Sequence, residues 1–166
     1  MSNTVRLADV ILHDSITDGP GMRSVIWFQG CERNCLGCHN KKTQDPKGGF
    51  TSEITVIIDE LIHQKMLSGV TISGGEPFNQ KEALLTIVQQ LKKAGLSIWV
   101  YTGYHYEELV DDPTAKLILS YIDVLVDGPF KLNLRDLQLH FRGSSNQRLI
   151  DVQASCLAEK VIVLTD

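Results

Sequence analysis

The hydrophobic pattern of the amino-terminal part of the chain indicates extended segments. From Val5 to Gln29 these segments flank a turn at Asp18–Gly21. Ser24–Phe28 is dense in β-forming residues and is predicted to be the first core strand. A loop that is polar through residues 41–49 follows it. The pattern therefore predicts strands followed by a long polar loop.

Two later stretches have the apolar spacing of amphipathic helices. The first is predicted to begin near Thr51 or Ser52, whose hydroxyl would cap the helix. The second is predicted to begin at Asn79, with Glu82 as its capping-box partner, and to end at Gly95. The inward faces of the two helices consist of Ile54, Ile57, Ile58, Leu61 and Ile62, and of Leu84, Ile87, Val88 and Leu91.

Short apolar runs alternate with these helices. Helical pieces are expected between Tyr106 and Tyr121, interrupted at Pro113. Strands that alternate with helices of this length indicate βαβ units and a parallel sheet, so the predicted fold class is α/β. The further strands are expected at Val70–Ser73, Ser97–Tyr101 and Asp123–Asp127.

The region nearest the carboxyl terminus has no helical period. Leu137–Val152 is interpreted as two short strands around Gly143–Asn146, and Lys160–Leu164 is a candidate closing strand. The chain shows no internal repeat, low-complexity segment or linker. Residues 1–166 are therefore expected to form a single domain.

The ends of the predicted parallel strands carry features that suit a binding site. A loop with three cysteines, Gly74–Glu76, Thr102–Gly103 and Asp127–Gly128 each follow a predicted strand. Ligands of parallel α/β sheets bind where loops leave the carboxyl ends of the strands. These four segments are therefore expected to lie together on one rim of the sheet.

Composition narrows the class of protein. The chain has 166 residues, 43% apolar and 22% charged, and is too short for an eight-unit βα barrel of roughly 250 residues. Its 16 basic and 20 acidic side chains give a formal charge of −4 without a basic stripe, which disfavours nucleic acid as a partner. No apolar run reaches the roughly 18 residues of a membrane span, and no signal-peptide layout is present. We therefore expect a cytoplasmic protein without a membrane partner.

The cysteines indicate chemistry. Cys31, Cys35 and Cys38 fall within eight residues, whereas Cys156 lies far away. In a reducing cytosol this spacing favours metal binding or thiol chemistry over a disulfide. Three soft thiolates suit a cubane iron–sulfur cluster whose fourth iron is open to a substrate. Zinc completed by His39 or Cys156, a disulfide and inert thiols remain alternatives. Cys156 is interpreted as a buried apolar residue and His39 as a loop residue.

Several runs of sequence resemble one enzyme superfamily. The spacing CxxxCxxC after a first strand resembles the signature of the radical S-adenosylmethionine (SAM) superfamily. The run Asp18–Asn40, DGPGMRSVIWFQGCERNCLGCHN, resembles the glycyl-radical activating enzymes within it, and Ser73–Pro77 resembles their glycine-rich motif. Three further runs resemble the small activases of anaerobic ribonucleotide reductase: Trp99–Tyr104, Asp123–Gly128 and Phe141–Arg148.

This resemblance implies two cofactors and a fold. It implies a [4Fe-4S] cluster on the three clustered cysteines, with S-adenosylmethionine on the fourth iron. Gly74, Gly75 and Glu76 would hold the methionine end of that cofactor, assisted by Asn40. Glycines permit close backbone approach and a carboxylate suits an ammonium group, so the residue types agree. The implied fold is an incomplete, partial βα barrel with a mainly parallel sheet, of the radical SAM type.

For two pairs of residues and one segment, the sequence leaves more than one role possible. Thr102 and Asp127 are placed to reach the carboxylate or ribose of the cofactor, but turn or capping roles fit them equally. Asp18 and Arg23 either border the glycine loop of a partner or belong to a plain turn. Arg142–Arg148 resembles the activases without a role that its residues define.

The resemblance implies an enzyme that cleaves SAM reductively and takes hydrogen from a glycine of its partner. The partner would be the large, glycyl-radical subunit of anaerobic ribonucleotide reductase, with a reduced flavodoxin-like electron donor. Another glycyl-radical enzyme or a small-molecule substrate is the alternative within this chemistry, and a zinc-stabilised interaction module is the alternative outside it. The chain has no acid–base histidine pair, nucleophile elbow or phosphate loop, so no side chain is assigned as catalytic acid, base or nucleophile.

Overall fold

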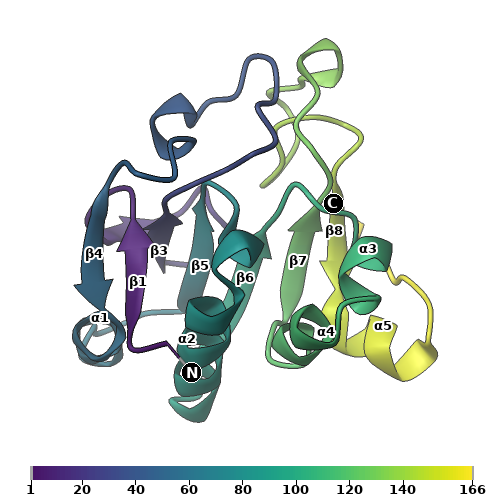
Figure 1. Ribbon diagram of the computed structural model, residues 1–166. Helices are drawn as coiled ribbons and strands as arrows, with labels where there is room; N and C mark the ends of the chain where they lie inside the picture. The colour runs from purple at the N-terminus through teal and green to yellow at the C-terminus, as the bar shows by residue number, and fades with distance from the viewer. Residues whose placement is uncertain (1, 166) are drawn as a thin grey trace.

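The computed structural model describes residues 2–165 of the chain (Figure 1). Within these residues eight strands form one sheet in the order β4-β1-β3-β5-β6-β7-β8, and β2 pairs with β3 beside this path. The strands are β1 (Thr4–Leu7), β2 (Leu12–Ser15), β3 (Arg23–Phe28), β4 (Phe50–Glu53), β5 (Gly69–Gly74), β6 (Ser97–Tyr101), β7 (Val124–Asp127) and β8 (Arg148–Asp151).

The centre of the sheet is parallel and its edges are antiparallel. β3, β5, β6 and β7 run parallel, and helices connect them. β1, β2 and β4 pair antiparallel at one side, and β8 pairs antiparallel with β7 at the other. The α/β class is thus confirmed, with each predicted central strand correct to within one residue at either end. The antiparallel edges were not predicted.

Short helices complete the fold. None of those described within residues 2–165 is long and apolar enough to cross a membrane. Helices α2 and α4 lie along one side of the sheet in Figure 1. The α-helices are α1 (Ile54–Ile62), α2 (Lys81–Lys93), α3 (Tyr106–Val110), α4 (Pro113–Leu119) and α5 (Val152–Ala158), and the 3-10 turns are η1 (Lys41–Thr43), η2 (Pro77–Gln80) and η3 (Leu132–Leu134).

The two faces of the sheet are covered differently. One face contributes to the main core, which also contains the buried side chains of α1 to α4. The other face carries a small cluster of Trp99, Val124, Val126 and Leu149, with Phe141 packed against it. Successive strand residues point to opposite faces, so β6 and β7 supply residues to both clusters, whereas β3 and β5 supply the main core alone. This explains why β6 and β7 appear as nearly continuous apolar runs in the sequence.

The first helix begins later than predicted. Thr51 and Ser52 belong to β4, which pairs with β1, and α1 starts at Ile54. Glu53 precedes the helix without a side-chain capping bond, so the predicted hydroxyl cap is wrong. Thr51 and Ser52 adopt a strand conformation because they pair with β1. Of the five residues predicted to point inward, only Ile62 is exposed, at 47%.

The second helix also begins later, at Lys81 rather than at Asn79. The preceding turn η2 forms instead, and the carboxylate of Glu76 caps it. The predicted capping box of Asn79 with Glu82 is therefore wrong, because the chain is already turning under a different cap. The predicted apolar face is buried, and the helix ends before Gly95, whose φ is 78°.

The carboxyl-terminal region differs most from expectation. Of the two strands predicted in Leu137–Val152, only β8 forms. The closing strand expected at Lys160–Leu164 is reduced to one bridge between Ile150 and Val163. Helix α5 was not predicted, because seven residues are too few to show a helical period. β8 turns back antiparallel because only the short turn η3, and no crossover helix, lies between it and β7.

Candidate functional site

A cavity of about 330 Å³, called the site cavity below, lies at the carboxyl ends of the parallel strands. Its walls come from the cysteine loop after β3 and from the residues that follow β5, β6 and β7. The predicted rim is thus confirmed. Eight of the nine predicted site residues line the cavity: Cys31, Cys35, Cys38, Asn40, Gly74, Gly75, Glu76 and Thr102.

The cysteine loop is held by its own backbone. The N–H of Cys31 donates to Gln44 (3.0 Å) and the N–H of Cys38 donates to Cys35 (3.1 Å). The N–H of Asn40 donates to the sulfur of Cys38 at 3.4 Å, so Asn40 touches the third thiol through its backbone. Burial raises the pKa of Cys31, and the nearby Glu76 adds to this shift. A positively charged metal centre would offset both effects.

The donor set suits an iron–sulfur cluster. Within residues 2–165 no three His, Cys, Asp or Glu side chains are arranged to hold a single metal ion. A cubane cluster differs, because each thiolate binds its own iron and the sulfurs need not converge on one point. Three half-buried thiols facing one cavity fit that requirement.

Gly74 and Gly75 pack the end of β5 against the start of the cysteine loop. A Cβ on Gly74 would lie 2.4 Å from the oxygen of Phe28, and one on Gly75 would lie 2.3 Å from the oxygen of Gly30. Gly74 has φ 104°, which side chains disfavour. The glycines therefore let two chain segments touch, and a backbone contact with the cofactor stays a prediction.

Glu76 is a buried carboxylate held by neutral donors. It is 1% exposed. Its Oε1 accepts from the hydroxyl of Thr102 (2.8 Å) and the N–H of Phe78 (3.2 Å), and its Oε2 accepts from the N–H of Gly103 (2.8 Å). Burial raises the pKa of Glu76, while these bonds and the charge of Arg33 lower it. Thr102 thus orients Glu76 and also lines the site cavity.

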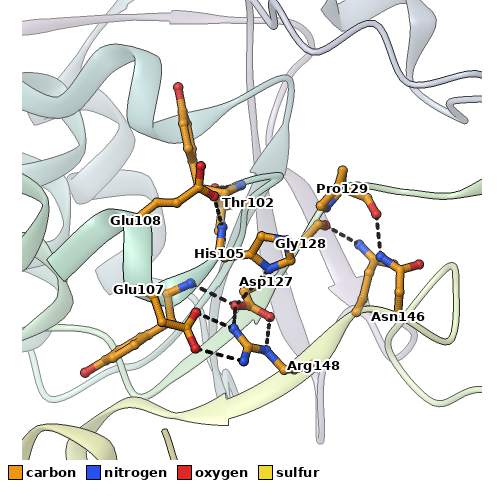
Figure 2. A network of polar contacts seen from close by, with 12 residues as sticks. Thr102, His105, Glu107, Glu108, Asp127, Gly128, Pro129, Asn146 and Arg148 are labelled. Carbon is orange, nitrogen blue, oxygen red and sulfur yellow. Dashed lines mark hydrogen bonds and ion pairs between the residues drawn. The ribbon is translucent and has the colours of Figure 1, made fainter. Parts of the chain in front are cut away.

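Asp127 does not line the site cavity. It is fully buried, and its carboxylate accepts from Nε and Nη2 of Arg148 and from the N–H of Tyr106 (Figure 2). Arg148 also donates to both oxygens of Glu107, whose pKa it lowers to about 2. The structure therefore favours a structural role for Asp127 over contact with the cofactor.

The segment Arg142–Arg148 now has a structural role. The side chain of Gln147 accepts from the N–H of Gly143 and donates to the oxygen of Gly128 (3.1 Å). Asn146 donates to the oxygen of Pro129 at 2.8 Å (Figure 2). Gly128, Gly143 and Gln147 line the site cavity. The segment thus fixes the wall that follows β7.

Arg33 is a site residue that sequence reasoning missed. It lines the site cavity, its guanidinium lies 4.1 Å from the ring centre of Tyr104, and its Nε is buried with no hydrogen-bond partner within residues 2–165. A buried donor without an acceptor is costly, so this atom points to a ligand. The available signal was that Arg33 is the single cation between Cys31 and Cys38.

Asp18 and Arg23 separate in the structure. Asp18 lines the site cavity. Arg23 is 1% exposed and donates to the hydroxyl of Thr71 and to two strand carbonyls, so its predicted place at a partner surface is wrong. Burial lowers the pKa of Arg23 to about 10.

Cys156 and His39 are the two further residues whose positions were predicted from the sequence. Cys156 is exposed on α5, 3.6 Å from the hydroxyl of Tyr106, and does not line the site cavity. Its interpretation as a buried apolar residue is wrong, because the unpredicted helix turns it outward. His39 lies in the cysteine loop with its ring 5.1 Å from that of Phe130.

The fold and the cavity define a class, that of α/β proteins with a cysteine loop at the strand ends. The family described as the 4Fe-4S single cluster domain matches residues 17–150, which include every residue lining the site cavity. An anaerobic ribonucleoside-triphosphate reductase-activating protein from Salmonella typhi is 38% identical over 143 residues, 80% of this chain and 90% of that protein.

Relatives of the same name occur in two other sources. The one from Escherichia coli strain K12 is 37% identical over 140 residues, 80% of this chain and 90% of its own. The one from Enterobacteria phage T4 is 32% identical over 147 residues, 85% of this chain and 91% of its own. The chain therefore belongs to the family of anaerobic ribonucleoside-triphosphate reductase-activating proteins. The prediction of an activating protein is confirmed at this level, and the family model agrees with the predicted iron–sulfur centre.

A solved structure shares the fold. QueE from Escherichia coli matches with a TM-score of 0.50 at 18% identity, over 60% of this chain and 52% of that one. This chain thus spans about half of QueE. The likeness concerns the fold alone and agrees with the α/β class.

Proposed function

We propose that this chain activates an anaerobic ribonucleotide reductase by creating a radical on a glycine of its large subunit. The supporting observation is that three thiols and one buried carboxylate face the same strand-end cavity, in a chain whose relatives are named as activating proteins of such a reductase.

The proposal assigns a [4Fe-4S] cluster to Cys31, Cys35 and Cys38, and SAM to the rest of the site cavity. When bound, these groups would supply one-electron reductive cleavage of the sulfonium bond of SAM, coupled to removal of hydrogen from a glycine. Three protein thiolates leave one iron for the cofactor. The chain contributes binding, orientation and exclusion of water.

Glu76 is assigned to the amino group of SAM. Its Oε1 already accepts two hydrogen bonds, whereas Oε2 accepts one, from Gly103, among the described residues. A carboxylate oxygen can accept at two positions, so Oε2 keeps one for an ammonium group. That positive group would also lower the pKa of Glu76 and so offset the effect of burial, which raises it.

Arg33 is assigned to an acidic group of the cofactor, since its Nε is buried beside the site cavity without an acceptor. A carboxylate would satisfy that donor in a charge-assisted bond. Stacking on Tyr104 holds the guanidinium in place.

The remaining walls position these groups. Gly74 and Gly75 bring backbone close to the cysteine loop, and Asn40 touches the sulfur of Cys38. Thr102 orients Glu76. We assign Asp127 to holding the wall after β7, through Arg148, and not to direct contact with the cofactor.

We further propose that residues 1–166 are one domain, built as an incomplete βα barrel and working in the cytoplasm. Four central parallel strands with helices on one face support the barrel-like architecture. A reduced flavodoxin-like protein is the proposed electron donor, and no nucleic acid or membrane partner is proposed.

The test is anaerobic reconstitution followed by electron paramagnetic resonance. Protein loaded with iron and sulfide is mixed with reductant, SAM and the reductase, and a glycyl radical is expected. Cys31→Ala, Cys35→Ala and Cys38→Ala should each abolish cofactor cleavage and the radical, whereas the matched control Cys156→Ala should not. Uptake of one zinc in place of four irons would support the zinc module. Cleavage of SAM without a protein radical would show that the substrate is another one.

A further inference from the structure

Positive charge gathers beside the cysteine loop of this acidic chain. Lys41, Lys42 and Lys47 are exposed, and none of them forms an ion pair within residues 2–165. Arg6 of β1 joins them, because its Nε donates to the oxygen of Gly48 (2.7 Å) and its Nη2 to the oxygen of Lys47 (2.6 Å). We call these four cations the basic patch.

Three carboxylates lie beside the four cations of the basic patch. Asp9 lines the same groove as Lys41 and Lys42, and the N–H of Val10 that it accepts leaves its negative charge in place. Asp45 accepts the N–H of Lys47, and Glu32 lines the cavity that contains Arg6. Four cations against three carboxylates give this surface a formal charge of +1, whereas the whole chain has 16 basic and 20 acidic side chains and a formal charge of −4.

The basic patch is joined directly to the backbone of the cysteine loop. The N–H of Cys31 donates to Gln44 and the N–H of Gly30 donates to Thr43 (2.7 Å), both in the segment between the lysines. The side chain of Gln29 donates to the oxygens of Lys42 and Asp45. A short hydrogen-bonded path thus connects the surface of the patch to the first cysteine.

Two depressions lead from the patch to Cys31 and Cys38, the first and third cysteines of the loop. The one that reaches Cys38 also shares Trp27, His39, Asn40 and Thr43 with the site cavity. One, of about 520 Å³, is lined by Arg6 and reaches Cys31. The other, of about 660 Å³, is lined by Lys41 and Lys42 and reaches Cys38. In Figure 1 η1, which carries these two lysines, lies over β1 and β4, at the opposite end of the rim from η3.

We propose that the basic patch is the docking surface of an acidic electron-transfer protein that reduces the cluster. The inference rests on the proposed function, which requires one electron from outside while the site cavity holds SAM and faces the glycine. In the docked complex the carrier loses one electron and the cluster gains it, with no bond made or broken. Small, charge-steered interfaces are typical of such transient pairs.

The test measures how fast reduced flavodoxin, an acidic flavoprotein, bleaches the cluster absorbance in a stopped-flow instrument. The double variant Lys41→Glu/Lys42→Glu is compared with Lys65→Glu/Lys93→Glu, which makes the same charge change at two exposed lysines outside the patch. The second-order rate constant should fall about tenfold or more in the patch variant at low salt. Its decrease with rising salt should also flatten, because fewer charges remain to be screened.

Dithionite separates failure of this inference from failure of the proposed function. With this small reductant both variants should cleave SAM at the wild-type rate, which shows that the cluster and cofactor site are intact. No cleavage in wild type with dithionite would sink the proposed function itself. Intact cleavage together with wild-type reduction by flavodoxin in the patch variant, or an equal loss in the control variant, would overturn the docking surface. Normal reduction but lost reductase binding would assign the patch to the reductase instead.

Discussion

Glu76 and Asp127 are both buried carboxylates, one just beyond β5 and the other at the end of β7, yet their surroundings differ. Glu76 accepts hydrogen bonds from one hydroxyl and two backbone N–H groups, and it lines the site cavity. Asp127 accepts a two-pronged bond from Arg148 and does not line it. Neutral donors stabilise a carboxylate without cancelling its charge, whereas an arginine cancels it.

This difference indicates which carboxylate can act on a ligand. The charge of Asp127 is already used to fasten β8 to β7 and, through Glu107, to α3. The charge of Glu76 remains available to a positive group that enters the cavity. The two strand-end acids therefore divide into a structural residue, Asp127, and a candidate ligand-binding residue, Glu76.

The largest expected effect is on folding, at Asp127. Asp127→Asn breaks an ion pair whose carboxylate is buried and should lower the free energy of unfolding by about 3 kcal/mol, the lower end of the range for such pairs, because Arg148 is 30% exposed and keeps Glu107. Glu107→Gln removes the exposed partner of the same arginine and should cost about 1 kcal/mol or less. Urea denaturation measures both. A stable Asp127→Asn protein that has lost SAM binding would reverse our assignment.

The next effect is on cofactor binding, at Glu76. Glu76→Gln removes the charge that we assign to the ammonium group and should weaken SAM binding about 10- to 100-fold, since a charged hydrogen bond contributes about 1.5–3 kcal/mol. Equilibrium binding to the reconstituted protein measures this. The variant should stay folded, at a cost of about 1–2 kcal/mol, because its amide N–H₂ faces a donor. Unchanged SAM affinity would contradict the assignment.

A smaller effect is expected in the pH dependence of stability, with opposite signs at the two sites. Burial raises the pKa of Glu76 above its ordinary 4.5, so its contribution to stability should fall as pH rises above about 4.5. Arg148 lowers the pKa of Glu107 to about 2, so that contribution is present above 4.5 and lost as pH falls toward 2. Denaturation of wild type, Glu76→Gln and Glu107→Gln across about pH 3 to 8 measures both slopes. If the contributions of Glu76 and Glu107 to stability changed with pH in the same direction, the two carboxylates would not differ in the way we describe.

The smallest effect concerns the wall after β7. Gln147→Ala removes hydrogen bonds to Gly128, Gly143 and Ser144. The free energy of local opening around Gly128 should fall by about 1–2 kcal/mol, so amide hydrogen exchange there should become faster. Gln153→Ala, which removes bonds to Ser120 and Ile122, is the control and should leave exchange at Gly128 unchanged. Equal protection in both variants would show that the Arg142–Arg148 segment does not fix this wall.

Local patterns predicted the centre of the fold better than its edges. The four parallel strands are short runs rich in β-forming and apolar residues, and this signal is present in any short window. The starts of α1 and α2 were misplaced because pairing of Thr51 and Ser52 with β1, and the cap supplied by Glu76, depend on distant or competing contacts. Helix α5 was too short to be detected.

The candidate site shows the same division. The cysteines and Gly74–Glu76 were found because spacing and residue type carry their signal. Arg33 was missed because its importance comes from a buried, unpartnered Nε, which only packing creates. Arg23 was left open between a partner surface and a plain turn, because a turn sequence does not show that the side chain points into the sheet.

The sequence by itself determined the thiol spacing, the α/β alternation and the family, since these depend on residue identity and local period. Tertiary structure decided which strand-end acid keeps its charge, because Arg148 reaches Asp127 only when β8 pairs with β7. It also created the basic patch, since Arg6 lies far from Lys47 in the chain and joins it through pairing of β1 with β4. Charges act through space, and only the fold sets those distances.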